Sequence, residues 1–265
     1  MKTALLLSGH MRSYKLAYEN QLKSIIEPNN CDVFITTSMI NTFVYSSDMK
    51  FPEKKPNAYY HLPHEDGSSG IIEVFQSEKE SLSREIKDIY GASLKGIVVE
   101  DEDINAIINN NFENDRKWAG HEKAWLRVKE CNDLKKKYEE ENDIKYDAVI
   151  KSRTDLFFKN PLKIYDFDMT EEDIFLSQHH AHPKISFQDQ FAFGNFKAMD
   201  VYCSMYDYYG KFREESVHGG FRSEDQLCDY LLSRELKINK INSFLQFGMI
   251  RGGSFPEDDK KVEVH

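Results

Sequence analysis

Two short apolar runs near the N-terminus, separated by a helical pattern, limit the fold of this chain most strongly. Residues 4–7 are uniformly apolar and are followed at once by a Gly-containing turn at 8–13. Apolar residues at helical spacing then continue to Pro28, and residues 31–37 form a second run rich in β-branched side chains. This order predicts a βαβ unit of two parallel strands, with a ligand crevice where the strands end.

The rest of the chain continues the alternation of strands and helices. Further strands are expected at 96–100, 146–158, 174–177 and 191–193, and helices at 120–140, 196–209 and 224–236. Residues 38–70 show no sustained period, and we expect a loop insertion or lid there. The pattern predicts the α/β class, with a Rossmann-like, mostly parallel sheet flanked by helices. We expect one domain over residues 1–255 and a mobile acidic tail at 256–265.

Charge and cysteine content bear on partners and location. The 265 residues include 35 Lys and Arg against 45 Asp and Glu, a net charge of −10. This acidic excess argues against a nucleic-acid partner. No stretch approaches the ~20 apolar residues of a transmembrane segment, and the four cysteines lack the spacing of a zinc or disulfide framework. We therefore expect a cytoplasmic protein, with peripheral membrane association left open.

Charged residues interrupt the predicted strand that begins at 146. Burial of such charges costs several kcal/mol unless they are paired or bound to a ligand. Strand alternation would place Lys151, Arg153 and Asp155 on one face. An Asp at the end of a central strand can hold a divalent cation, and cations neutralise a diphosphate leaving group. The alternative is a structural Arg–Asp pair that locks the edge of the sheet.

The sequence KSRTD at 151–155 resembles the K-x-R-x-D segment of nucleotide-sugar glycosyltransferases of the GT-A fold. The resemblance is greatest to small bacterial and viral transferases of the lipopolysaccharide-core type, the WavE-like proteins. The segments SGHMRSY at 8–14 and DQFAFG at 189–194 also resemble parts of that family. The resemblance implies sugar transfer from a nucleotide-sugar donor to a glycan or glycolipid acceptor, with Mn²⁺ or Mg²⁺ as cofactor. Asp155 is a single carboxylate where the more familiar D-x-D motif has two.

The loop after the first predicted strand supplies candidate donor-binding residues. Gly9 would let a ligand approach the backbone closely, and Arg12 has the geometry to bind a phosphate through two hydrogen bonds. The loop lacks the Gly-rich phosphate motifs, so an ordinary strand-to-helix turn is the alternative. The residues expected to bind the donor are Ser8, Gly9, His10, Arg12, Lys151, Arg153, Asp155 and Arg251.

Three acidic residues are candidates for a catalytic base that removes the proton of an acceptor hydroxyl. Asp189 would stand at the mouth of a strand, whereas Glu224 and Asp225 begin a helix whose dipole they would also stabilise. Ser223 and Gln226 have the spacing of a capping box at the start of that helix. The expected metal ligands are Asp155 and His182. His182 belongs to a His-rich segment for which a solvated loop is the ordinary interpretation.

Two other functions share these features. A sugar nucleotidyltransferase has the same alternation of strands and helices. However, a Gly-rich phosphate loop would be expected after its first strand, and residues 8–12 contain one Gly. A non-catalytic nucleotide-binding module would use the acidic surface and the insertion at 38–70 for partner contacts. The sequence favours a glycosyltransferase, in which a locally basic cleft lies within an acidic surface.

Overall fold

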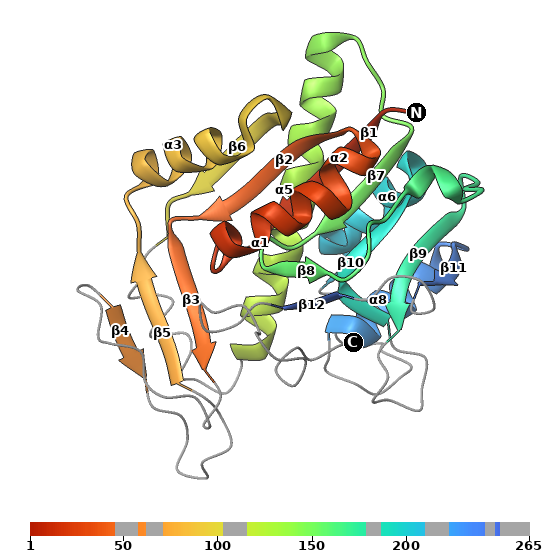
Figure 1. The fold of residues 1–265 in the computed structure, drawn as a ribbon. Helices are drawn as coiled ribbons and strands as arrows, with labels where there is room; N and C mark the ends of the chain where they lie inside the picture. The colour runs from red at the N-terminus through yellow and green to blue at the C-terminus, as the bar shows by residue number, and fades with distance from the viewer. Residues whose placement is uncertain are drawn as a thin grey trace.

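A seven-stranded sheet forms the centre of the computed structural model, which describes residues 1–45, 58–61, 71–102, 116–178, 187–209, 223–241 and 247–249 (Figure 1). The strand order is β11-β9-β10-β7-β1-β2-β6. These strands are β1 (Thr3–Ser8), β2 (Cys31–Ser38), β6 (Leu94–Glu100), β7 (Ala148–Ser152), β9 (Asp173–Gln178), β10 (Phe187–Asn195) and β11 (Lys237–Lys240). Neighbours pair in parallel except at β10, which runs antiparallel to β7 and β9. The expected α/β class with a mostly parallel sheet is confirmed.

Helices cover both faces of this sheet, which explains why its inner strands are apolar throughout. They are α1 (Tyr14–Gln21), the π-helical η1 (Leu22–Ile26), α2 (Glu27–Asn29), α3 (Lys79–Tyr90), α5 (Arg116–Asn142), α6 (Phe196–Cys203) and α8 (Ser223–Ser233). Short 3₁₀ turns are η2 (Gly91–Ser93), η3 (Ile164–Asp166) and η4 (Ser204–Tyr208). Leu5 and Leu7 pack with α1, η1 and α3 on one face, whereas Ala4 and Leu6 pack with α5, α6 and α8 on the other.

The segment expected as a loop insertion at 38–70 contributes two strands to a small antiparallel sheet in the order β3-β5-β4, and the central strand β5 follows it directly. These strands are β3 (Ile40–Tyr45), β4 (Ala58–His61) and β5 (Ile71–Gln76). They are short, and Pro- and Gly-containing stretches separate them in sequence, so no local period marks them. Only pairing between distant segments makes them strands. The tail at 256–265 lies outside the described residues.

The predicted strand at 146–158 is divided in the structure. β7 ends at Ser152, and β8 (Leu156–Phe158) pairs instead with β12 (Phe247–Met249) in a separate two-stranded sheet. Residues 153–155 therefore form a turn between two sheets, not the continuation of one pleated strand. Within the described ranges, no helix has the length and apolarity needed to span a bilayer.

A bulge interrupts β10 where it passes β9. Phe187 pairs with Gln178 and Ala192 with Leu176, so residues 188–191 face a single residue, Ser177. Extra residues in one strand leave their carbonyl and amide groups outside the regular ladder. This bulge lies beside β7, where Ala192 pairs with Lys151.

We predict that Gly194→Ala destabilises the fold. Gly194 lies in β10 between Val149 and Ile174, and a Cβ atom there would stand 2.7 Å from the backbone oxygen of Asp173. Backbone cannot move aside as a side chain can, so we expect a loss of about 1–3 kcal/mol in the free energy of unfolding, measured with urea. Gly96→Ala is the control, because its added Cβ meets mainly the side chain of Leu134. Equal losses for both variants would contradict this explanation.

Candidate functional site

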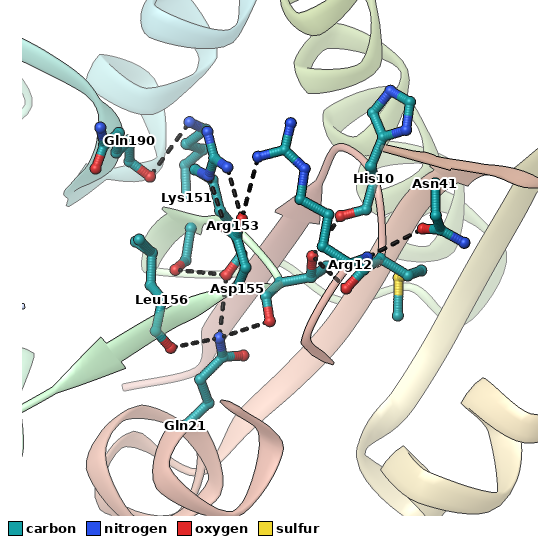
Figure 2. A network of polar contacts seen from close by, with 12 residues as sticks. His10, Arg12, Gln21, Asn41, Lys151, Arg153, Asp155, Leu156 and Gln190 are labelled. Carbon is teal, nitrogen blue, oxygen red and sulfur yellow. Dashed lines mark hydrogen bonds and ion pairs between the residues drawn. The ribbon is translucent and has the colours of Figure 1, made fainter. Parts of the chain in front are cut away.

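The loop after β1 and the turn after β7 lie together because these two parallel strands are neighbours in the sheet. Thr154 Oγ1 donates a hydrogen bond of 2.7 Å to the backbone oxygen of His10. Gln21, buried on α1, donates from Nε2 to the backbone oxygens of Arg153 (3.1 Å), Thr154 (3.2 Å) and Leu156 (2.9 Å) (Figure 2). The turn is thus held against the loop and the first helix.

The backbone of the loop after β1 takes left-handed conformations at two residues. Gly9 has φ of 120°, which suits glycine, and its amide donates to the oxygen of Thr36 (3.1 Å). Arg12 has φ of 42°, a conformation that costs a side-chain-bearing residue on the order of 1 kcal/mol. Asn41 of β3 accepts a hydrogen bond of 3.0 Å from the Arg12 amide and so supports this conformation. Ser8 is buried at the end of β1.

Asp155 accepts hydrogen bonds from two arginines at the centre of the site. Arg153 binds it through Nε (2.8 Å to Oδ1) and a terminal nitrogen (2.7 Å to Oδ2), and Arg12 approaches Oδ2 at 3.3 Å (Figure 2). The carboxylate is 1% exposed, whereas the arginine side chains remain 26–27% exposed. Burial acts to raise the pKa of Asp155, but the two guanidinium groups outweigh it and hold that pKa well below its usual range. The arginines are therefore fixed in place and still accessible to a ligand.

The donor atoms at Asp155 do not fit a metal ion. Both carboxylate oxygens accept from guanidinium groups, and a divalent cation there would be repelled by two positive charges. Within the described ranges, no group of three or more His, Cys, Asp or Glu side chains is arranged to hold a metal. His182 lies outside the described residues. The Arg–Asp pair, which is the alternative interpretation of this motif, is formed.

Lys151 binds the bulge of β10. Its side chain is 5% exposed, and Nζ donates to the backbone oxygens of Asp189 and Gln190, the second at 3.3 Å (Figure 2). The bulge removes these oxygens from the ladder, so they are available to the ammonium group. Burial lowers the pKa of Lys151 to about 8. Lys151, predicted to bind the donor, thus has a direct role in shaping the strand that carries Asp189.

Both the side chain and the backbone oxygen of Asp189 accept hydrogen bonds. Its Oδ2 accepts a hydrogen bond of 3.0 Å from Ser223 Oγ, and its backbone oxygen accepts from the Tyr202 hydroxyl at 3.2 Å. Burial acts to lower the pKa of Arg153, but the carboxylates of Asp155 and Asp189 raise it. Charges on the turn after β7 and on the bulge of β10 therefore influence one another.

His10 contributes a neutral imidazole. Its Nδ1 lies 2.6 Å from the backbone oxygen of Ile40, and since a carbonyl only accepts, the hydrogen is assigned to Nδ1. Burial, followed by the charges of Arg127 and Arg12, lowers the pKa of His10 to about 3. At pH 7 the other ring nitrogen is therefore a hydrogen-bond acceptor beside the positive charges.

The start of α8 differs from the expected capping box. Ser223 Oγ donates to Asp189, and Gln226 is fully buried with neither side-chain polar atom hydrogen-bonded to a residue that the structure describes. Asp225 is buried and Glu224 is half-buried in the first turn. Of the three base candidates, Asp189 is the one that the described contacts join to the cationic cluster. Arg251 lies outside the described residues.

Several residues support the site through contacts that the sequence did not predict. Gln21 and Asn41 support the loop and the turn, Tyr202 and Ser223 donate hydrogen bonds to Asp189, and Trp125 donates one to Ser223. Each of these side chains acts on a partner from another element of the fold, so its role depends on tertiary contacts.

Neither a protein-family model nor a curated protein sequence matches the chain significantly. Among solved structures, it is similar to the apo form of the glycosyltransferase GlyE from Streptococcus pneumoniae TIGR4, with a TM-score of 0.42 and 11% identity. That match covers 92% of this chain but 46% of the other, so the chain spans about half of that protein's length. The galactosyltransferase LgtC, solved with donor and acceptor sugar analogues, matches with a TM-score of 0.45 and 8% identity, over 90% of this chain and 73% of that one.

We predict that Asp155→Asn lowers stability at pH 7 by about 2 kcal/mol, because it leaves two guanidinium groups without a buried counter-ion. Folding lowers the pKa of Asp155 in the wild type. The carboxylate therefore stabilises the fold above its unfolded pKa of about 3.9, and this stabilisation is lost as the pH falls below that value. The difference between the two proteins should therefore shrink from about pH 4 towards pH 2. Urea unfolding at several pH values measures it.

Asp168→Asn is the control for this experiment, since Asp168 is exposed. Its stability should follow that of the wild type across the same pH range. A difference for Asp155→Asn that persists unchanged at pH 2 would contradict the role of its negative charge.

Proposed function

We propose that the protein is a glycosyltransferase that moves a sugar from a nucleotide-sugar donor to a hydroxyl group of a glycan or glycolipid acceptor. One observation carries this proposal: two partly exposed guanidinium groups are fixed on the buried Asp155 carboxylate, and a second carboxylate, Asp189, is close enough for its charge to raise the pKa of Arg153. Fixed positive charges can stabilise the negative charge of a phosphate leaving group, and a nearby carboxylate can accept the proton of an acceptor hydroxyl. The two requirements of sugar transfer are thus met within one site.

Arg12 and Arg153 are proposed to bind the donor diphosphate. Guanidinium groups present paired donors that match phosphate oxygens, and Asp155 restricts their orientation before a ligand arrives. The backbone at Ser8 and Gly9 lies at the carboxyl end of β1, and the neutral His10 ring adds an acceptor there for a donor group of the nucleotide. Charge that develops on the departing diphosphate would then be stabilised by groups already in position.

Asp189 is proposed as the general base. The acceptor oxygen forms a bond to the anomeric carbon, and the bond from that carbon to the diphosphate oxygen breaks, with its electron pair leaving on the nucleotide. The proton of the acceptor hydroxyl passes to the Asp189 carboxylate. Oδ1 accepts no hydrogen bond from the part of the chain that the structure describes, whereas Oδ2 is bonded to Ser223. Glu224 and Asp225 remain the alternative bases for the same step.

We also propose a cytoplasmic location and a role in polysaccharide synthesis, with a hexose or pentose as the transferred sugar. All four cysteines, Cys31, Cys131, Cys203 and Cys228, are free and buried, which fits a reducing compartment. Burial raises the pKa values of their thiols, so they are unreactive core residues.

We predict that Arg12→Lys and Arg153→Lys each weaken binding of a nucleotide diphosphate sugar by about tenfold or more, since lysine cannot form the paired hydrogen bonds of arginine. Thermal shift and calorimetry with UDP-, GDP- and dTDP-sugars measure this loss, and CMP-sugars, which carry one phosphate, should bind more weakly. Binding should be the same in EDTA and in Mn²⁺. Arg234→Lys is the matched control, because Arg234 packs on Tyr208 in another part of the fold. Equal affinity in all four proteins would contradict the proposed donor site.

We predict that Asp189→Asn lowers kcat by about 10²–10⁴-fold while donor affinity is retained, because the amide cannot accept the acceptor's proton. Glu224→Gln and Asp225→Asn should have smaller effects on kcat. Product analysis with a panel of hydroxyl acceptors measures transfer, and release of pyrophosphate from a nucleoside triphosphate and a sugar phosphate would instead identify a nucleotidyltransferase. A larger loss of kcat for Glu224→Gln or Asp225→Asn would instead identify that residue of α8 as the general base.

A further inference from the structure

Three side chains from three different elements form a chain of hydrogen bonds that ends on Asp189. Trp125 of α5 donates from its indole nitrogen to Ser223 Oγ at 2.9 Å, and Ser223 at the start of α8 donates to Asp189 Oδ2 at 3.0 Å. Trp125 and Ser223 are each 2% exposed, so water does not compete for these bonds.

The direction of both hydrogen bonds follows from the chemistry of the indole group. An indole nitrogen can only donate, so Ser223 Oγ must accept from Trp125. The single hydroxyl hydrogen of Ser223 then remains available for Asp189. A hydroxyl that accepts one hydrogen bond becomes a stronger donor in the next, and the effect is larger where water is excluded. The arrangement therefore presents an oriented donor to one oxygen of the carboxylate.

The backbone of Asp189 is fixed as well as its side chain. Tyr202 and Lys151 both donate to the Asp189 backbone oxygen, and the Tyr202 ring packs edge-on against Trp125 with centroids 5.3 Å apart. Because residues 188–191 bulge out of the sheet, they lack the ladder contacts that would otherwise set their geometry. Side chains from α5, α6, α8 and β7 take the place of those contacts.

We propose that Ser223 and Trp125 are positioning residues for Asp189, with Trp125 acting through Ser223. The proposal rests on the proposed function of Asp189 as the base of a sugar transfer. With Oδ2 bonded to Ser223, Oδ1 is the oxygen directed to the acceptor hydroxyl. Correct placement of a base contributes to kcat, whereas the donor is held by the arginines and its affinity does not depend on this chain of bonds.

The kinetic test separates positioning from general stability. Ser223→Ala should lower kcat by about tenfold and change the donor KM by less than about threefold, and Ser223→Thr, which keeps the hydroxyl, should recover most of the loss. Trp125→Phe keeps an aromatic ring but removes the indole hydrogen, and should lower kcat by a smaller factor. In the double variant Trp125→Phe/Ser223→Ala, kcat should equal that of Ser223→Ala alone, because the indole hydrogen bond is proposed to act on the Asp189 carboxylate through Ser223, and the Phe ring keeps the packing on Tyr202. The proposal would be overturned if the kcat losses of the two single variants multiplied in the double variant. Equal kcat losses for Ser223→Ala and Ser223→Thr would also overturn it.

A second test needs no turnover. The protein has two tryptophans, so an amide-type ¹H–¹⁵N spectrum shows two indole signals, and Trp125→Phe identifies the one that belongs to Trp125. Asp189→Asn should shift this signal even though Asp189 is bonded to Ser223 and not to Trp125, and Ser223→Ala should shift it further. The control is Asp207→Asn, which removes the partner of Lys129 on the same helix and should leave the signal in place.

The two tests distinguish failure of this proposal from failure of the proposed function. If the wild-type protein transfers no sugar but Asp189→Asn shifts the Trp125 signal, the chain of bonds is supported and the transferase assignment fails. The positioning role is wrong if the protein is an active transferase, the Trp125 signal does not shift in Asp189→Asn, and the Ser223 variants keep full kcat.

Discussion

The site depends on one buried carboxylate shared by two arginines. Arg12 and Asp155 are 143 positions apart in the sequence, and their contact requires β1 and β7 to be neighbours with their carboxyl ends aligned. A charge as buried as that of Asp155 is tolerated because the guanidinium groups compensate for the lost hydration. The carboxylate also limits the conformations of the two arginine side chains. Less conformational entropy is then lost when a ligand binds to them.

The one antiparallel strand of the main sheet brings the second half of the site to this cluster. β10 lies next to β7, and its bulge at residues 188–191 exposes backbone oxygens that Lys151 binds. The buried Lys151 therefore has a structural role, because it holds the bulge, in addition to its position in the charged motif. The same bulge carries Asp189, whose negative charge acts with that of Asp155 to raise the pKa of Arg153.

The elements of the fold were largely predictable because their signals are local. Residues 4–7 and 31–37 form strands as expected, and the amphipathic period at 120–140 lies within α5. The sheet at 40–76 was missed because its pairing joins segments without a period of their own. Strand alternation also wrongly extended β7 to Asp155: Arg153 and Asp155 meet in a turn held by Gln21, not on one face of a pleat.

The sequence by itself determined the fold class and the charged motif, since burial patterns and a charged run in an apolar segment are both properties of neighbouring residues. It named Arg12, Arg153, Asp155 and Asp189 as separate candidates. Only the tertiary structure decided what these residues do to one another. Asp155 has both oxygens bonded to arginines, which does not suit the metal expected there. Asp189 gains an oriented donor from Ser223, because hydrogen bonds between distant segments leave no periodic trace in a sequence.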